Sequence, residues 1–177
     1  MNTLQGPLVY EIMIELKEIL ESDHTIYKTL ILRGLNEDQS CFRIAPEDEL
    51  SEPFPTNEEQ DSFTLGAFDE EQLIGVVSFI RDGQNRRKLR HKGILFRLYV
   101  DPNFRGKGVA KLLIEAVIDR VKLIENIEQI NLTVIPTNKQ AKAIYEKFGF
   151  QTFASEEKAI KWEGQYFSED QMKLLLK

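Results

Sequence analysis

The chain has 177 residues, of which 42% are hydrophobic, and it carries a formal net charge of −6. This length and apolar content suffice for a full core, so we expect a single domain over 1–177, with 1–10 as a candidate N-terminal extension. The acidic balance argues against a nucleic-acid-binding protein, because such proteins carry an excess of basic residues. The sequence also lacks the run of about 18 apolar residues that a membrane-spanning helix needs, so no membrane association is expected.

Cysteine and histidine are rare in this chain. Cys41 is the single cysteine, and together with the two histidines it shows no metal-ligand spacing, so neither an internal disulfide nor a bound metal is expected. A packed or half-exposed thiol is favoured for Cys41 over a nucleophile. The first residues lack the basic region and apolar stretch of a secretory signal, and we expect a cytoplasmic protein.

The first third of the chain carries no recognisable functional motif. The segment 12–16 alternates apolar and polar residues like a strand, with a helix as the open alternative. Ser22 or Asp23 is the expected N-cap of a helix running to about Leu35. Its inward residues are expected to be Ile26, Leu30 and Ile31. The acidic segment 36–61 then predicts a short helix after Pro46 followed by irregular chain.

Two strands and a basic run come next. The strands are expected at Phe63–Phe68 and Gln72–Arg81, joined by the hairpin signal Asp69-Glu70-Glu71. The basic run comprises Arg81, Arg86, Arg87, Lys88, Arg90, His91 and Lys92. A solvated loop is the favoured interpretation of this run, and contact with an anionic ligand is the functional alternative.

The most informative stretch begins with the strand Gly93–Val100. A turn at Asp101-Pro102-Asn103 leads into a loop with Gly106 and Gly108, and an amphipathic helix is expected over about 106–124. The start of a helix has unpaired N–H groups and the positive end of the macrodipole, and the glycines remove side chains that would keep an anion away. Arg105 and Lys107 add positive charge, and arginine grips phosphate bidentately. The stretch predicts a backbone cradle for a phosphate or diphosphate.

Two familiar phosphate loops do not fit these residues. A Walker A loop requires Ser or Thr after Gly-Lys, and a dinucleotide fingerprint requires three spaced glycines in a repeating strand-helix-strand sheet. The pattern Arg105-x-x-Gly108-x-Ala110 instead resembles the coenzyme A pyrophosphate loop of the GNAT superfamily of N-acetyltransferases.

A second motif supports the resemblance. The strand-like run Ile130–Ile135 is broken by Pro136-Thr137-Asn138, and Asn138 opens a helix over 139–148 that Gly149 closes. The segment Asn138-x-x-Ala141-x-x-x-Tyr145-Glu146-Lys147-Phe148-Gly149-Phe150 resembles the second signature of the superfamily. The resemblance covers roughly residues 62 to 154, and two final strands are expected at Phe150–Trp162 and Gln165–Leu176.

The order of the elements predicts an α+β fold with a mixed, mainly antiparallel central sheet flanked by helices. The resemblance implies the GNAT-like acyl-CoA N-acyltransferase fold, in which the coenzyme is wedged where two central strands splay apart. By resemblance, those strands are Gly93–Val100 and Ile130–Ile135.

The resemblance also implies which residues serve acetyl-CoA as the acyl donor, without a metal. The loop residues Arg105, Gly106, Lys107, Gly108, Val109 and Ala110 would hold the diphosphate, and Leu98, Tyr99 and Val100 would follow the pantetheine arm. The N–H of Val100 would polarise the thioester carbonyl. Asn131 and Asn138 are further expected coenzyme contacts, although helix capping alone also accounts for Asn138. Tyr145 would protonate the departing thiolate, with a role as a core aromatic residue as the alternative.

The acceptor implied by the resemblance is a primary amine, acetylated by direct transfer in a ternary complex. The residues that would decide its identity lie in the segments 22–61 and in the final hairpin, and no motif there identifies it. Glu47, Glu49 and Glu52 are expected to be surface carboxylates, so no general base is assigned. Arg97 is expected either to reach the acceptor or to form a structural ion pair.

A small-molecule amine is the favoured acceptor, because an acidic chain mildly attracts cations. A protein N-terminus or lysine is the alternative, and a non-catalytic acyl-CoA-binding module is the hypothesis of another class. A monomer and a homodimer are both open.

Overall fold

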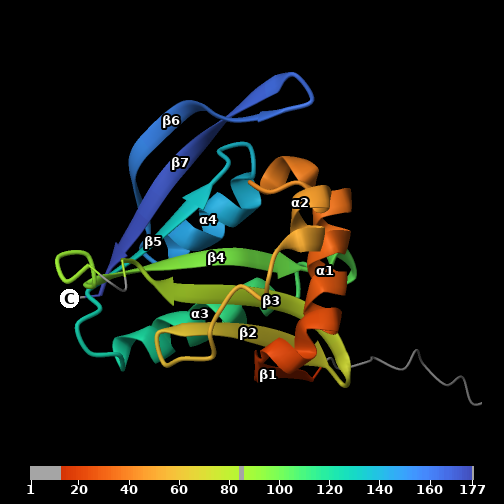
Figure 1. Ribbon diagram of the computed structural model, residues 1–177, viewed down its shortest axis with the longest axis horizontal. Helices are drawn as coiled ribbons and strands as arrows, with labels where there is room; N and C mark the ends of the chain where they lie inside the picture. Colours follow the sequence, from red (N-terminus) through yellow and green to blue (C-terminus); the bar gives the residue numbers. More distant parts are fainter. Residues whose placement is uncertain (1–12, 84–85, 177) are drawn as a thin grey trace, which may run out of the picture.

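The computed structural model describes residues 13–83 and 86–176 (Figure 1). The candidate extension 1–10 and residue 12 of the first expected element lie outside the described residues. In chain order the elements are β1 (Ile14–Ile19), α1 (His24–Glu37), α2 (Pro46–Ser51), β2 (Ser62–Asp69), β3 (Gln72–Arg81), β4 (Lys92–Val100), α3 (Val109–Lys122), β5 (Gln129–Val134), α4 (Lys139–Lys147), β6 (Gln151–Trp162) and β7 (Gln165–Leu175), with short 3-10 turns at Glu21–Asp23, Gln39–Cys41 and Pro102–Phe104.

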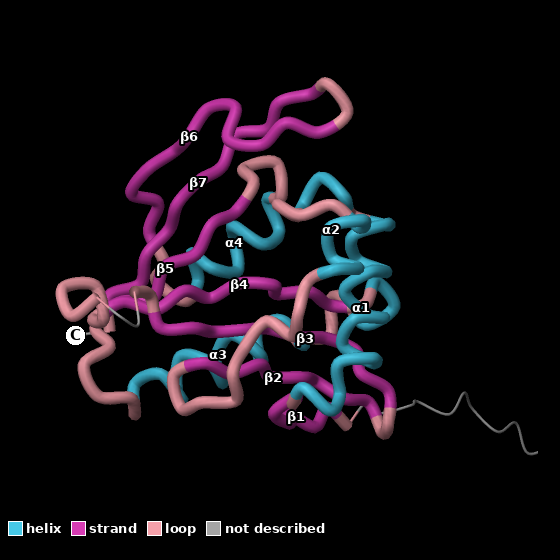
Figure 2. Tube along the Cα trace, in the orientation of Figure 1, coloured by secondary structure: helices cyan, strands magenta, loops and turns pink. Residues whose placement is uncertain are grey.

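One seven-stranded sheet organises the molecule, in the order β1-β2-β3-β4-β5-β7-β6. Strands β4 and β5 run parallel, and the other neighbouring pairs run antiparallel. The sheet is therefore mixed and mainly antiparallel, and helices flank it, which confirms the predicted α+β fold. The long β6–β7 hairpin extends past the rest of the sheet (Figures 1 and 2).

Helices cover both faces of the sheet (Figure 2), and a core of buried residues lies on each face. Helix α1 packs on one face through a cluster that includes Tyr27, Ile31, Val76 and Tyr99. Helices α3 and α4 lie on the other face, where the larger cluster includes Leu95, Leu113, Val117, Ile130 and Tyr145. The two helical layers hold β4 between them, so that its side chains contribute to both cores.

The structure corrects two details of the expected helices. In α1, Tyr27 is fully buried and Ile26 is 44% exposed, because Tyr27 shares one helical face with Leu30 and Ile31 and Ile26 lies off that face. Helix α3 begins at Val109 rather than at Gly106. Gly106 and Gly108 have φ angles of +75° and +85°, which are incompatible with a right-handed helix.

Candidate functional site

The central feature of the candidate site is a gap between β4 and β5. The two strands pair through Lys92–Ile94 on β4 and Gln129–Asn131 on β5, and among the described residues their pairing ends there. Beyond this point β4 runs on to Val100 and β5 to Val134, so their facing edges separate (Figure 1). This confirms the expected splay, and it leaves backbone N–H and C=O groups available to an extended ligand.

A β-bulge in β4 lies beside this gap. Val76 of β3 pairs with Tyr99 and Ser78 with Phe96, so two residues of β4, Arg97 and Leu98, stand opposite the single residue between them. Arg97 has a φ of +53°, which is uncommon for a residue with a side chain. Along a strand, successive peptide groups face opposite edges, and an extra residue reverses which edge each later peptide group faces.

The reversal decides which edge of β4 the peptide group of Val100 faces. The N–H of Asp101 donates to the carbonyl of Ile74 on β3 at 2.9 Å, so the N–H of Val100, one residue earlier, faces the opposite edge and the gap. Before the bulge, the even-numbered residues of β4 face β3, since the carbonyl of Lys92 accepts from the N–H of Asp82 at 2.8 Å. Without the extra residue, Val100 would face β3.

The loop after β4 leads into the N-terminus of α3. The carboxylate of Asp101 accepts from the N–H of Asn103 at 2.9 Å and fixes the turn. Gly108 is the N-cap of α3, and a Cβ placed on Gly106 or Gly108 would meet no atom within 4 Å. The glycines are therefore required by their left-handed backbone and not by packing within the chain. Open space next to a helix N-terminus suits an anionic group.

The two basic side chains of the loop have partners within the protein. The guanidinium of Arg105 donates through Nε to the carbonyl of Val100 at 3.0 Å and through Nη2 to Asp38 at 2.5 Å. The ammonium of Lys107 lies 4.9 Å from the ring centroid of Phe104. Arg105 therefore connects the loop to the end of β4 and to the segment after α1. Direct binding of phosphate by Arg105 stays a prediction.

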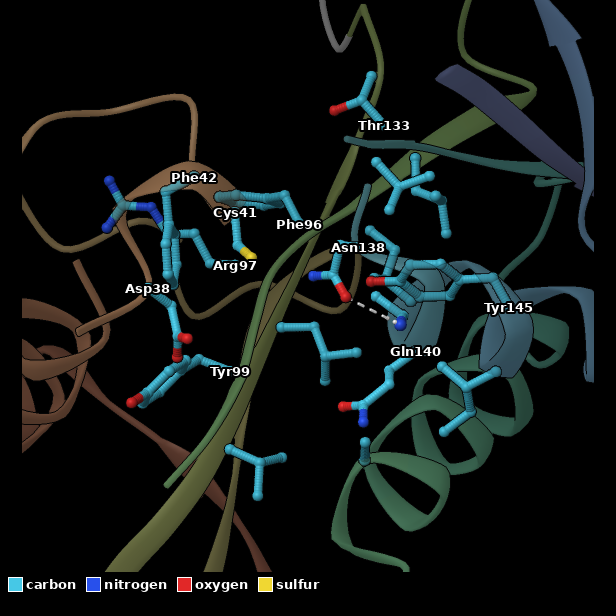
Figure 3. A pocket seen from close by; sticks show the side chains of 18 of the residues that line it. Asp38, Cys41, Phe42, Phe96, Arg97, Tyr99, Thr133, Asn138, Gln140 and Tyr145 are labelled. Atoms are coloured by element: carbon cyan, nitrogen blue, oxygen red, sulfur yellow. Dashed lines mark hydrogen bonds between the residues drawn. The ribbon is translucent and has the colours of Figure 1, made fainter. Parts of the chain in front are cut away.

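A cavity of about 1040 Å³ joins the gap to the loop. Of the residues predicted from the sequence, those lining it are Leu98, Tyr99, Val100, Arg105, Gly106, Gly108, Val109, Ala110, Asn131, Asn138 and Tyr145. Lys107 is absent from its described lining. Figure 3 shows Asp38, Phe42 and Tyr99 on one side of β4, and Asn138 and Tyr145 on the other. The cavity therefore passes between the layers at the splayed strands.

Helix α4 contributes Asn138 and Tyr145 to this cavity. The side-chain oxygen of Asn138 accepts from the N–H of Ala141 at 3.1 Å, which confirms its capping role (Figure 3). Tyr145 is 6% exposed, and its ring packs edge-on against Phe150 with the centroids 5.7 Å apart. Burial raises the pKa of the Tyr145 phenol well above its ordinary value, so the phenol stays protonated in the physiological range.

Sequence reasoning pointed to the segments 22–61 and the final hairpin but singled out none of the residues in them that line the cavity. Asp38, Cys41 and Phe42 line the cavity, as do Phe153 of β6 and Gln171 of β7. Cys41 is exposed, whereas a packed or half-exposed side chain was expected. No local pattern marked these residues, because they reach the cavity only through the packing of α1 and of the β6–β7 hairpin on the sheet.

Two charged residues that were expected at the surface are buried in ion pairs. Glu49, expected on the surface, is fully buried and pairs with Arg97. Arg97 thus forms the ion pair that was one of its two alternatives, but it also lines the cavity, so its contact with the acceptor stays a prediction. Arg81, counted in the basic run, is buried and pairs with Asp61. In both cases the partner lies on a distant segment that the local pattern does not reveal.

Comparison with known proteins places this geometry in a family. The model of the acetyltransferase (GNAT) family matches residues 29–150. The chain belongs to this family. A GNAT-family acetyltransferase from Streptococcus pneumoniae shares the fold with a TM-score of 0.76 at 23% identity, covering 92% of this chain and 99% of that one. A Salmonella typhimurium protein solved with its cofactor acetyl-CoA has a TM-score of 0.77 at 14% identity, covering 93% and 95%.

This GNAT chain is also similar in sequence to curated acetyltransferases. A spermine/spermidine N(1)-acetyltransferase from Bacillus subtilis is 32% identical over 93 residues, which is 49% of this chain and 58% of that protein. N-alpha-acetyltransferase 30 from Saccharomyces cerevisiae is 28% identical over 134 residues, 71% of this chain and 75% of that protein. The chain thus spans somewhat over half the length of the polyamine-modifying relative.

Two further features of this GNAT structure concern metals and membranes. Among residues 13–83 and 86–176, no group of three or more His, Cys, Asp or Glu side chains is arranged to hold a metal ion. The helices of the described chain are too short or too polar to span a bilayer.

Proposed function

We propose that this protein is an N-acetyltransferase that moves the acetyl group of acetyl-CoA onto a primary amine by direct transfer in a ternary complex. The observation that carries the proposal is one cavity that combines the open edge of β4 with the N-terminus of α3. A diphosphate fits the helix end, and an extended acyl-pantetheine arm fits the strand edge.

The proposed chemistry uses few protein groups. The deprotonated amine attacks the thioester carbonyl, and the N–H of Val100 stabilises the oxyanion that forms there. The carbon–sulfur bond then breaks, and the phenol of Tyr145 protonates the departing thiolate. The attacking nitrogen loses one proton to solvent, and solvent returns one proton to the Tyr145 phenolate, so the enzyme is regenerated. Asn138 and Asn131 line the cavity where the pantetheine arm would lie.

The proposed acceptor is a small cationic amine. Support comes from the net charge of −6 and from the likeness to a spermine/spermidine acetyltransferase. A protein N-terminus is the second candidate, favoured by the yeast N-alpha-acetyltransferase, whose similarity covers a larger share of this chain.

Release of free thiol from acetyl-CoA tests the proposal. Thiol release is expected only when an amine is added, with polyamines, amino acids, aminoglycosides and N-terminal peptides assayed in parallel. Turnover by polyamines above peptides supports the small-amine acceptor, and the reverse order supports the protein acceptor. Acetyl-CoA binding without turnover by any of these amines would instead favour a non-catalytic acyl-CoA-binding module.

A further inference from the structure

A buried ion pair joins the bulge of β4 to α2, on the face of the sheet that α1 and α2 cover. Nη1 of Arg97 donates to Oε1 of Glu49 at 3.0 Å, and its Nη2 lies 2.9 Å from Oε2 of the same carboxylate. Nη1 also donates to the phenol of Tyr27 at 3.0 Å. The side chain of Glu49 is fully buried and that of Arg97 is 15% exposed, so water screens their attraction weakly.

The backbone at Arg97 needs such a restraint. A φ of +53° is unfavourable for a residue with a Cβ and persists only where the surroundings hold it. Arg97 is also the first of the two bulged residues, and the bulge turns the N–H of Val100 toward the gap. The contacts of the guanidinium with α1 and α2 therefore act on the part of β4 where the thioester would lie.

We propose that Glu49 is a positioning residue for acetyl transfer, because its pairing with Arg97 holds the bulge that directs the N–H of Val100 into the cavity. This inference rests on the proposed function, since it assigns Glu49 a part in that reaction. Glu49 lies outside the described lining of the cavity. Its Oε1 accepts from Arg97, and its buried Oε2 lies 2.9 Å from Nη2 of Arg97 without a hydrogen-bond partner among the described residues. It therefore acts through Arg97 and not as the base that deprotonates the amine.

Glu49→Gln tests the proposal, with Asp61→Asn as the matched control. Both changes replace a carboxylate with an amide opposite a buried arginine of the sheet, but the Asp61–Arg81 pair lies outside the described cavity lining. Glu49→Gln is expected to lower kcat about 10-fold or more and to change KM for acetyl-CoA less than about threefold, because the diphosphate anchor is untouched. Asp61→Asn is expected to keep kcat within twofold.

Two further readouts separate positioning from other roles. The pH profile of kcat in Glu49→Gln should keep its shape at a lower plateau, whereas removal of a general base would abolish its acidic limb. The backbone amide resonances of Leu98 and Val100 should shift in Glu49→Gln and stay in place in Asp61→Asn. The resonances are read without substrate, so they decide the inference even if the wild-type protein transfers no acetyl group and the proposed function fails.

A folding defect is handled by a paired variant. If Glu49→Gln does not fold, Glu49→Leu with Arg97→Met removes both buried charges together, a change that proteins often tolerate. Because Arg97 lines the cavity, the same loss of kcat would support the proposal only with a cooperative melt and shifted amide resonances of Leu98 and Val100. Full kcat in either variant, equal losses in Glu49→Gln and Asp61→Asn, or unmoved amide resonances would overturn it.

Discussion

Arg105 and Asp38 join two parts of the chain that the sequence separates by 67 positions. Their contact holds the loop that opens α3 against the segment after α1, and the Nε of Arg105 fixes the same loop to the carbonyl of Val100. The side chain of Arg105 is 41% exposed and that of Asp38 is 29% exposed, so solvent weakens the pair. The resemblance to the family implies that Arg105 holds the diphosphate of the coenzyme. In this structure its guanidinium braces the loop at which that diphosphate would bind.

A double-mutant cycle distinguishes bracing of the loop from a direct grip on phosphate. If Arg105 mainly braces the loop, Arg105→Ala and Asp38→Asn should each raise KM for acetyl-CoA by about fivefold, which corresponds to about 1 kcal/mol. The double variant should then be no worse than either single change. A much larger effect of Arg105→Ala alone would show that the guanidinium acts through more than Asp38, either through the Val100 carbonyl or through the coenzyme.

The glycines of the loop should be required for coenzyme binding in addition to the stability that any side chain would cost at their left-handed backbone. Valine at Gly108 or Gly106 meets a left-handed backbone and adds methyl groups in the space next to the helix N-terminus, so affinity for acetyl-CoA should fall at least tenfold. Gly164 at the tip of the β6–β7 hairpin also has a positive φ, of +80°, and equally open surroundings. Gly164→Val should therefore cost similar stability and leave calorimetric affinity unchanged. Equal losses of affinity in all three variants would argue against a diphosphate site.

Tyr145→Phe should lower kcat by about 10²-fold, the usual contribution of a general acid, with KM for acetyl-CoA nearly unchanged. Because the pKa of the phenol is raised, Tyr145 stays protonated well into the alkaline range, and the loss should be the same at pH 7 and pH 9. Steady-state rates across this range measure it. A Tyr145→Phe enzyme with full kcat would reduce Tyr145 to a packing residue.

The ion pair between Lys142 of α4 and Asp170 of β7 should make stability depend on pH. Their oxygen and nitrogen lie 2.6 Å apart, and the hydrogen bond from Lys142 holds the pKa of Asp170 below its usual range. This contribution is present above the ordinary carboxyl pKa of about 4 and is lost as pH falls through the lowered value. Asp170→Asn should lower Tm at pH 7 by about 2–4 °C and much less near pH 3.

Asp119→Asn is the matched control for that measurement. Asp119 pairs with Lys122 on α3, but both side chains are more than half exposed, so its Tm should match the wild type at both pH values. An equal shift in both variants would assign the effect to net charge and not to the α4–β7 contact.

The parts of this site that the sequence predicts depend on local patterns of residues. The strand before the loop, Gly106, Gly108 and the cap at Asn138 each depend on residues within a few positions, and the structure places them as expected. Helix α3 begins three residues later than the sequence pattern predicts, because that pattern does not show that Gly106 adopts a positive φ.

The remaining half depends on contacts between distant segments. The bulge at Arg97 is held by Glu49, 48 positions earlier, and the carboxylate looks like a surface residue in its acidic surroundings. Ile26 and Tyr27 are adjacent and both apolar, so only packing on the sheet decides which of them is buried. These features depend on tertiary contacts, and the residues next to them in the sequence do not indicate them.

A crystal structure of the protein with acetyl-CoA tests the central claim most directly. The account predicts two linked phosphoryl groups against the main-chain amides of residues 106–110 and the thioester carbonyl within hydrogen-bonding distance of the N–H of Val100. A coenzyme bound elsewhere, or a loop that stays empty at saturating acetyl-CoA, would contradict it.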